Sequence, residues 1–498
     1  MGKSTTKSIA YNVSWLFVGN SINGIILFFT VIFVARILGA EFFGLYQLAQ
    51  AFLAYLLIMV DYSLSIFGTR EISQAGKNAG RISANLFMVR LLLAIVVFFI
   101  SIILVFFAPI TGQMRLIFIA TFSFVFYRAF NADWAFQAIE KMRCIPLAKI
   151  MFSLLSLLFI IFFVKSPVDL VNIPLIQASC GLATSFFFLF ILFKYYLPFQ
   201  KGYLEPLTWP KYFIRALPLG ASVIMVQIYN NLDTVMLGLM DKAAVVGYYS
   251  VAYKVYFVLI GFLGLWQYTA IPVMNKRMSL DMSAAKIFLE KYIRLTILFF
   301  SPFIVLVFLL APLIIRMAFG DEYIAAIPAL RLLILSLLPI ILSSNYGMLL
   351  LIPAGSFNNY FFSVASGAIV NVIFNYFFIS HYSLVGAAGA TIIAEITVLL
   401  MVIYFSKNII NVPITRNIIK TGFYLLLSYF AYFLINVITI HLPIMLRFSF
   451  SAFVFVAVYT FIAGYSERIF IFGFIREIVD KKSIKRFGIL GRYFNETA

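Results

Sequence analysis

The chain has 498 residues, of which 64% are hydrophobic and only 11% are charged, and its mean hydropathy is +1.05. This composition excludes a large water-soluble catalytic domain. The net charge of +19 would suggest a nucleic-acid partner in a soluble protein, but here its meaning depends on where the basic residues lie. We therefore expect an all-α protein that crosses the membrane many times.

Apolar runs predict about fourteen transmembrane helices. A helix needs roughly 20 apolar residues to cross the hydrocarbon core of a bilayer, and each run is close to that length. The runs lie near residues 11–34, 42–63, 85–108, 115–138, 145–164, 170–193, 212–238, 245–270, 292–313, 327–350, 358–379, 385–406, 417–440 and 444–463.

Lys and Arg are distributed unevenly over the joints between these spans. When the N-terminus is placed in the cytoplasm, most of them fall on the cytoplasmic side, and Arg90 is counted there with its neighbours. This bias predicts a multi-pass protein of the plasma (cytoplasmic or inner) membrane with both termini in the cytoplasm. It explains the net charge by contact with anionic membrane lipids, so no nucleic-acid partner is expected. The first run is too long for a cleavable signal peptide.

A short motif recurs at the start of two spans. Gly44-Leu-Tyr46 in the second span matches Gly247-Tyr-Tyr249 in the eighth, at an offset of 203 residues. An even number of spans separates the copies, so the halves share one orientation, as in transporters built from parallel repeats. This predicts two six-helix lobes plus two extra C-terminal helices, with alternating access by rocking of the lobes. The expected domains are residues 1–200, 201–410, 411–463 and a basic cytoplasmic tail, 464–498.

The fourth span carries ionisable residues at membrane depth, where charges are costly and usually face the bundle interior or a water-filled path. Arg128 lies near its middle, and its planar guanidinium could bind an anionic ligand. The alternative is a salt bridge to a carboxylate on another helix. Asp133, Gln137 and Glu140 follow with helical spacing and are expected to form a second polar stripe, on which Asp133 is a candidate for ion coupling.

Polar residues also cluster in the seventh and eighth spans. Gln227, Asn230 and Asp233 lie within seven positions of an otherwise apolar helix, and Lys254 follows in the next one. Asp233 and Lys254 could form a structural ion pair across the two helices. Alternatively, Lys254 faces a central cavity as part of an anion site, with Gln227 and Asn230 as further cavity residues and Asp233 as a coupling residue.

Two isolated charges complete the set of candidates. Glu395 in the twelfth span is a candidate for proton or cation coupling, because burial favours the neutral form of a carboxylate and so allows it to change protonation near neutrality. The alternative is a hydrogen bond to a neighbouring helix. Arg36 is an interface anchor or, at the outer mouth of a cavity, a residue that contacts substrate. From Arg468 to Arg492, aromatic and aliphatic residues are interleaved with basic ones, as in a helix lying on the cytoplasmic leaflet.

Motifs for enzymatic chemistry are missing from the sequence. Two cysteines and two isolated histidines provide no metal-ligand spacing, and no HExxH, CxxC or phosphate-binding GxxxxGK[ST] string occurs. We therefore expect a protein without metal or cofactor that is not an enzyme.

Three strings together resemble the oligosaccharide-lipid flippases, the O-antigen and polysaccharide transporters of the superfamily that also contains multidrug extruders and lipid II flippases. They are ARILGAEFFGLY at 35–46, DWAFQAIEKM at 133–142, and NLDTVMLG at 231–238 with VGYY at 246–249. The resemblance covers roughly the first 270 residues and is mainly topological beyond them. Ala40 and Ala138 stand where the family often has Gly or Pro.

The resemblance implies a transporter that moves a polyprenyl-diphosphate-linked oligosaccharide from the cytoplasmic to the outer leaflet for cell-surface polysaccharide synthesis. It implies a cationic cavity for the diphosphate, for which Arg128 and Lys254 are the candidates, and membrane lipids and a glycan polymerase or other assembly proteins as partners. A cation-coupled multidrug extruder of the same superfamily is the first alternative. A membrane glycan polymerase or ligase is the second, although the outer joints are short and Asp321–Glu322 is their single adjacent carboxylate pair.

Overall fold

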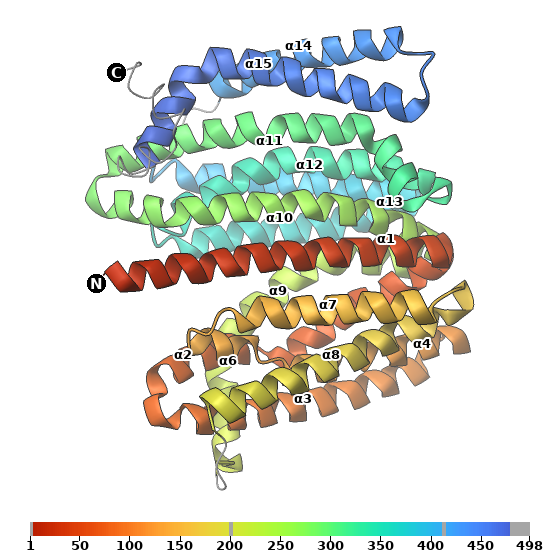
Figure 1. Cartoon of the computed structure of the whole chain (residues 1–498), viewed down its shortest axis with the longest axis vertical. Coiled ribbons are helices and arrows are strands. Elements are labelled where there is room, and N and C mark those ends of the chain that lie inside the picture. The colour runs from red at the N-terminus through yellow and green to blue at the C-terminus, as the bar shows by residue number, and fades with distance from the viewer. Residues whose placement is uncertain (1–2, 199–202, 411–414, 479–498) are drawn as a thin grey trace. The chain divides into compact units, whose positions relative to one another are not determined.

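The computed structural model describes residues 3–198, 203–410 and 415–478, and in these ranges it consists of helices without a β-strand (Figure 1). The chain divides into two compact units, Met1–Val251 and Ala252–Ala498. The helices of the first unit are α1 (Lys3–Asp61), α2 (Leu64–Ala75), α3 (Ala79–Phe107), α4 (Gly112–Phe122), α5 (Val125–Phe130), α6 (Asp133–Ala138), α7 (Cys144–Phe163), α8 (Asn172–Ile191), α9 (Trp209–Met240) and the start of α10 (Ala243–Leu280).

The second unit begins within α10 and continues with long apolar helices. They are α11 (Met282–Phe319), α12 (Ile327–Tyr346), α13 (Phe357–Ser406), α14 (Thr415–Ile438) and α15 (Ile444–Ile478). Short 3-10 turns precede α8 and α12, and a π-helical turn continues α12 to Leu351. The helix α15 extends beyond the expected last span as far as Ile478, and the rest of the expected surface helix lies outside the described residues.

Two of the longest helices contain a break at which the chain reverses. Gly39 in α1 has φ 70° and Ser383 in α13 has φ 53°. A left-handed residue ends one helix and allows the next to start at once, and glycine adopts that conformation without strain. Each break falls in a joint expected between two spans, so α1 and α13 each combine two of the predicted runs.

Eleven helical segments of the described chain are long and apolar enough to cross a membrane. This confirms the all-α, multi-pass class, while the count of fourteen spans stays a prediction. Many apolar side chains on these helices are exposed, for example Phe107, Phe162 and Leu426. Such exposure fits a protein whose surrounding medium is hydrocarbon, because lipid tails take the place of a buried core.

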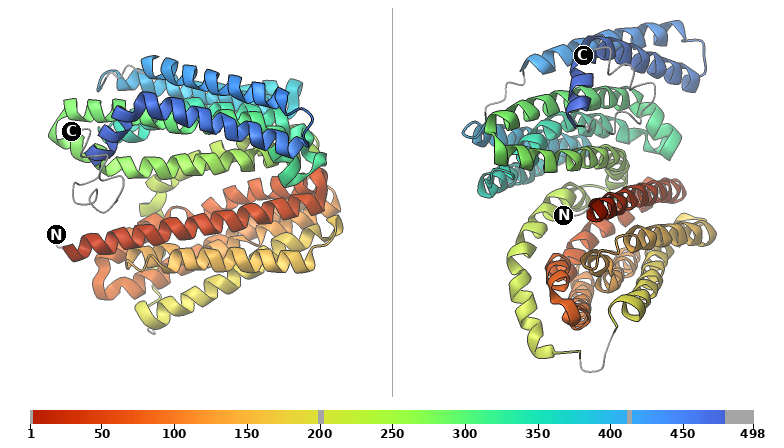
Figure 2. Two further views of the ribbon diagram at one scale, coloured as in Figure 1. Left: turned by 45° about the horizontal axis from the view of Figure 1, so that its top comes forward. Right: turned by 60° about the vertical axis from the view of Figure 1, so that its left-hand side comes forward.

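The first unit packs around α1. Both α7 and α9 lie against it, and α2 packs on α3 and α6 (Figures 1 and 2). Aromatic rings fill the space at the α2–α3–α6 contact, where the Phe87 and Trp134 ring centroids are 5.0 Å apart. This contact fixes α6 and the residues that precede it, which include Arg128.

The second unit is organised around α11 and α12. The helices α12 and α13 pack extensively, while the hairpin of α14 and α15 lies against α11 (Figure 1). The core of the second unit includes Phe288, Tyr292 and Leu350, which are all fully or almost fully buried. The two C-terminal helices are thus attached to this unit through α11.

The repeated motif forms a reciprocal contact within the first unit. A Cβ added to Gly44 would lie 1.7 Å from the carbonyl oxygen of Ala243, and a Cβ added to Gly247 would lie 2.1 Å from the carbonyl oxygen of Ala40. At the offset of 203 residues, Gly44 corresponds to Gly247 and Ala40 to Ala243, so the two copies use equivalent atoms on each other. The geometry supports the internal repeat, while the expected domain boundary at residue 200 stays a prediction.

Candidate functional site

The expected fourth span is interrupted rather than continuous. The helix α5 ends at Phe130 and α6 begins at Asp133, and Asn131 between them has an extended backbone with ψ 124°. Such a break leaves carbonyl oxygens without helical partners, and inside a membrane these must find other donors. The carbonyl of Asn131 accepts hydrogen bonds from the Trp134 indole, at 3.0 Å, and from Arg90 Nη1, at 3.0 Å.

Arg90 on α3 is the central donor at this break. Its Nη2 also donates to the carbonyl oxygen of Arg128, and its side chain has an exposed fraction of 0%. A fully buried guanidinium requires a counter-charge. Asp61, the last residue of α1, supplies it, with its Oδ1 3.2 Å from Arg90 Nη2.

Asp61 joins both arginines. Its Oδ1 also accepts a hydrogen bond from the Ser65 hydroxyl at 2.5 Å, and its Oδ2 lies 3.3 Å from Arg128 Nη2. The Arg128 side chain is 38% exposed, in contrast to that of Arg90. We call Asp61, Arg90 and Arg128 the arginine cluster. It contains two cations and one anion, and its surplus positive charge reaches the surface of the unit through Arg128.

The arginine cluster contains the salt bridge expected as one alternative for Arg128, while the role of Arg128 in anion binding stays a prediction. Arg128 does form a salt bridge to a carboxylate on another helix, and that carboxylate is Asp61. The distribution of basic residues places Arg90 in a cytoplasmic joint, and the structure instead places it within α3 with its side chain buried. The missing signal was Asp61 at the end of the second run, since a buried acid requires a buried base.

The polar stripe expected after Arg128 is only partly present. Asp133 is half-buried at the start of α6, and its backbone N–H donates to Asn131 Oδ1 at 3.2 Å. Gln137 is exposed on the same helix. Glu140 follows the end of α6 with φ 59°, so it does not continue the helical stripe. The break before α6 also invalidates the assumption of one continuous helix from Arg128 to Asp133.

The residues of the seventh and eighth spans lie on α9 and α10. Asp233 is buried and its Oδ2 accepts a hydrogen bond from the Tyr249 hydroxyl at 2.6 Å. Lys254 is half-buried, and no ion pair of it occurs among the described residues. Gln227 and Asn230 belong to α9, but their side chains lie outside those that the structure describes. The hydrogen bond to Tyr249 takes the place of the expected Asp233–Lys254 pair.

Arg36 and Glu395 occupy different environments. Arg36 is exposed, three residues before the break of α1 at Gly39. Glu395 is half-buried on α13 and lies close enough to Tyr360 for the two side chains to interact electrostatically. The roles of both as cavity or coupling residues stay predictions.

A second buried ion pair lies in the other unit. Arg294 on α11 pairs with Glu467 on α15, and the Tyr424 hydroxyl of α14 donates to Glu467 Oε1 at 3.2 Å. The Arg294 guanidinium also stacks over the Phe470 ring, 4.1 Å from its centroid. We call Arg294, Tyr424, Glu467 and Phe470 the α11–α15 clamp, because it ties the C-terminal hairpin to α11.

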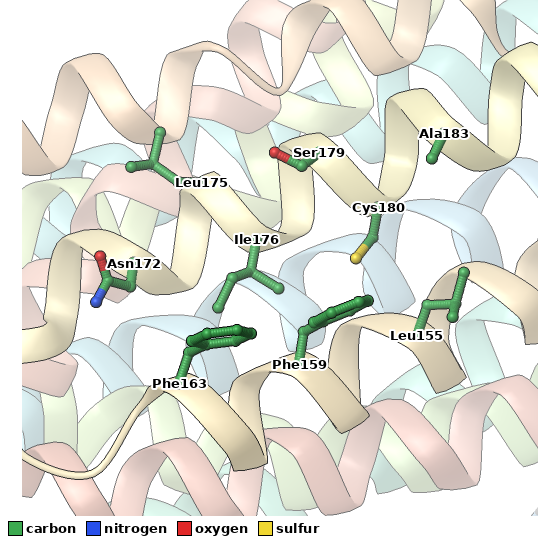
Figure 3. A pocket seen from close by; sticks show the side chains of 9 residues that line it. All are labelled: Leu155, Phe159, Phe163, Asn172, Leu175, Ile176, Ser179, Cys180 and Ala183. Atoms are coloured by element: carbon green, nitrogen blue, oxygen red, sulfur yellow. The ribbon is translucent and has the colours of Figure 1, made fainter.

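A groove between α7 and α8 has a volume of about 510 Å³. Figure 3 shows Phe159 and Phe163 on one side and Ile176 and Cys180 on the other, with Asn172 at one end. None of its nine lining residues carries a charge. Both helices are long and apolar enough to span a membrane, so the groove offers an apolar surface rather than an anion site.

These features define a multi-pass, all-helical membrane protein with charged residues buried between its helices. The model of the family described as "Polysaccharide biosynthesis protein" matches residues 9–278, more than half of the chain. The chain therefore belongs to this polysaccharide biosynthesis protein family, in agreement with the resemblance inferred from its sequence.

Two curated relatives cover most of the chain. One from Escherichia coli (strain K12), named "Putative O-antigen transporter", is 21% identical over 80% of this chain and 97% of its own length. One from Shigella dysenteriae with the same name is 24% identical over 80% of this chain and 99% of its own length.

Solved structures show the same fold. The lipid II flippase MurJ in an inward closed conformation matches with a TM-score of 0.75 and 16% identity, over 91% of this chain and 99% of that chain. An inward-facing multidrug resistance MATE family transporter matches with a TM-score of 0.66 and 15% identity, over 80% and 98%. At these identities the likeness concerns the fold, and the flippase structure covers more of the chain.

Proposed function

We propose that this protein is a flippase that moves a polyprenyl-diphosphate-linked oligosaccharide from the cytoplasmic to the outer leaflet of the plasma membrane. Its family, its O-antigen transporter relatives and its lipid II flippase-like fold support this proposal. The observation that carries the substrate class is the surplus positive charge of the arginine cluster, which suits a diphosphate.

Moving the polar part of such a lipid across the membrane requires a protein. A diphosphate and a glycan cannot enter hydrocarbon unaided, because charged and polar groups lose their hydration there. The prenyl chain can remain in lipid while the polar part passes through the protein. An inside-negative potential of 100 mV favours outward movement of an anion by about 2.3 kcal/mol per charge. Part of the driving force can therefore be electrical.

Transport proceeds by alternating access of two repeat-derived lobes in this proposal. Arg128 and Lys254 supply positive charge to the cavity, and Arg36, Asn230 and Gln227 contact the diphosphate or the sugars. The reciprocal contact of the repeats supports the two-lobe architecture. Both termini lie in the cytoplasm, as the distribution of Lys and Arg predicts.

Coupling to an ion and contacts with assembly proteins complete the proposal. Glu395, Asp233 and Asp133 are the coupling candidates, since each is a carboxylate at membrane depth with little or moderate exposure. A glycan polymerase or another assembly protein would receive the substrate at the outer face. The protein itself performs transport and no bond-making step.

A multidrug extruder is the second candidate, and the MATE-like fold favours it. Such a protein binds organic cations, for which a cavity with excess positive charge is unfavourable. Arg128 is partly exposed, and its partner Asp61 also pairs with Arg90. Its charge is therefore only partly compensated, which favours an anionic substrate.

The test is the pool of lipid-linked glycan in cells that lack the protein. We expect lipid-linked oligosaccharide to accumulate on the cytoplasmic side and surface polysaccharide to fall, with rescue by the wild type. Arg128→Ala and Lys254→Ala, at matched expression, should fail to rescue. Arg316→Ala removes an exposed arginine paired with Asp321 and is the control that should rescue. Unchanged pools and surface glycan in the deleted cells would contradict the flippase proposal.

A further inference from the structure

We infer that Asp61 occupies the anion site as an internal substitute for the substrate: it holds Arg128 in the unloaded protein, and the diphosphate takes its place on Arg128 during loading. This inference rests on the proposed function and adds a regulatory residue to its anion site. It depends on three features of the arginine cluster, namely the unequal oxygens of Asp61, the fixed position of Arg90 and the exposure of Arg128.

The two oxygens of Asp61 have different partners. Oδ1 lies 3.2 Å from Arg90 Nη2 in an ion pair and accepts a hydrogen bond from the Ser65 hydroxyl at 2.5 Å. Oδ2 is 3.3 Å from Arg128. When Arg128 leaves, Asp61 therefore keeps a full cationic partner and a hydroxyl donor. A carboxylate that remains paired does not incur the cost of an isolated buried charge.

Arg90 stays in place during such an exchange. Its guanidinium is fully buried and also donates to the carbonyl oxygens of Asn131 and Arg128 at the break after α5. Moving it would remove a donor from both carbonyls and leave that of Asn131 with the Trp134 indole alone. Inside the membrane, each unsatisfied group is costly. Arg90 is thus a positioning residue for Asp61, and the exchange is confined to Arg128.

Arg128 is the member that can change partners. Its side chain is 38% exposed, while that of Asp61 is 11% exposed. It stands three residues before the chain break, in a helix of only six residues. Asp133, another carboxylate near it, interacts electrostatically with Lys149 as well as with Arg128 and Arg90. With Asp133 and Lys149 included, the group still carries one excess positive charge.

The net charge of the cluster favours an anionic ligand. Asp61, Arg90 and Arg128 together carry one excess positive charge, and a diphosphate would neutralise it. Phosphate oxygens accept the parallel N–H groups of a guanidinium in the same bidentate way as a carboxylate does. Asp61 in turn repels an arriving anion until Arg128 has been transferred, so its charge lowers the affinity for the diphosphate.

The experiment measures binding of farnesyl diphosphate, a short prenyl diphosphate, to the full-length protein in lipid nanodiscs. Asp61→Asn removes the competing charge and keeps the shape of the side chain. We expect it to bind the probe about fivefold more tightly than the wild type, as estimated from the strength of partly exposed ion pairs. Arg128→Gln should abolish binding, and the double variant should behave as Arg128→Gln alone, because Asp61 acts through Arg128.

The matched control is Glu467→Gln, which neutralises a buried carboxylate of the α11–α15 clamp and should leave the affinity unchanged. Equal or weaker binding by folded Asp61→Asn would overturn the inference, and so would the absence of binding by both wild type and Asp61→Asn. Either result is compatible with accumulation of lipid-linked glycan in cells that lack the protein. Failure of this inference can therefore be distinguished from failure of the proposed function.

A second measurement uses the wild type and does not depend on folding of a variant. A structure with the probe bound should show Arg128 on the diphosphate and more than about 4 Å from Asp61, beyond the range of an ion pair. Arg90 should still contact Asp61. A bound diphosphate on Arg128 with the Asp61–Arg128 pair intact would overturn the exchange.

Discussion

The arginine cluster and the α11–α15 clamp are both partly buried ion pairs between helices, yet their surroundings differ. In the clamp, one arginine meets one glutamate, and Tyr424 and Phe470 complete the contacts of both partners. In the cluster, two arginines share Asp61, and Arg128 keeps much of its side chain exposed.

In our proposal, this difference separates a structural attachment from an anion-binding site. A charge-balanced pair with all its partners present gains little from a further ligand, and its role is to fix the position of a helix. A cluster with excess charge and an accessible member retains capacity for an anion. Burial of the charges is thus less informative than their balance and the exposure of each partner.

The largest effect is expected for Arg90→Met. The substitution leaves Asp61 without its buried partner and removes the donor to two carbonyl oxygens, so the free energy of unfolding should fall by about 3–5 kcal/mol. Thermal unfolding followed by tryptophan fluorescence in detergent measures it. Arg128→Met, the same chemical change at the exposed member, should cost less than about 1 kcal/mol. Equal losses for the two variants would remove the distinction between anchor and accessible arginine.

An intermediate effect is expected for Glu467→Gln in the clamp. Arg294 then loses its charged partner while Tyr424 keeps an acceptor, and the free energy of unfolding should fall by about 1–3 kcal/mol. The same unfolding assay measures it. Surface polysaccharide per folded molecule should remain normal, because the clamp does not bind substrate. Loss of surface polysaccharide with a well-folded variant would show that the clamp, like the arginine cluster, is needed for more than stability.

The smallest effect is expected for Arg81→Ala, which breaks an exposed ion pair. Arg81 Nη1 is 2.9 Å from Glu205 Oε1, and both side chains are more than a third exposed. Screening by water should keep the loss below about 0.5 kcal/mol in the unfolding assay. A loss of unfolding free energy as large as that for Glu467→Gln would mean that the exposure of an ion pair does not determine its contribution to stability.

The sequence was sufficient for the fold class and the family, because hydropathy and local strings carry that information. The internal repeat stays a prediction that the glycine contacts support. Arg128 could also be located, since a charge in an apolar run is conspicuous. Its partner could not, because the contact between Asp61 and Arg128 depends on how α1 packs on α5. Arg90 was misplaced for a related reason, as it lies close to a basic joint along the chain and inside the unit in space.

The break after α5 was hidden from periodicity analysis. Residues 115–138 read as one apolar run, but Asn131 is extended and its side chain accepts from the backbone of Asp133. A short polar side chain that binds nearby backbone competes with the helix, and the buried Arg90 stabilises the carbonyls that are released. The residue that stabilises the break, Arg90, is therefore on a different helix, so the local sequence around residue 131 does not predict the break.

The reciprocal glycine contact limits the substitutions that the two copies of the motif can tolerate. Each copy of the repeat presents a backbone carbonyl to the other copy's glycine, at a distance where a methyl group would collide. Mutation can change the sequences of the two copies independently elsewhere, but at Gly44 and Gly247 each copy restricts what the other can become. The contact thus disfavours larger side chains at Gly44 and Gly247 together, because each glycine lies against the other copy's backbone.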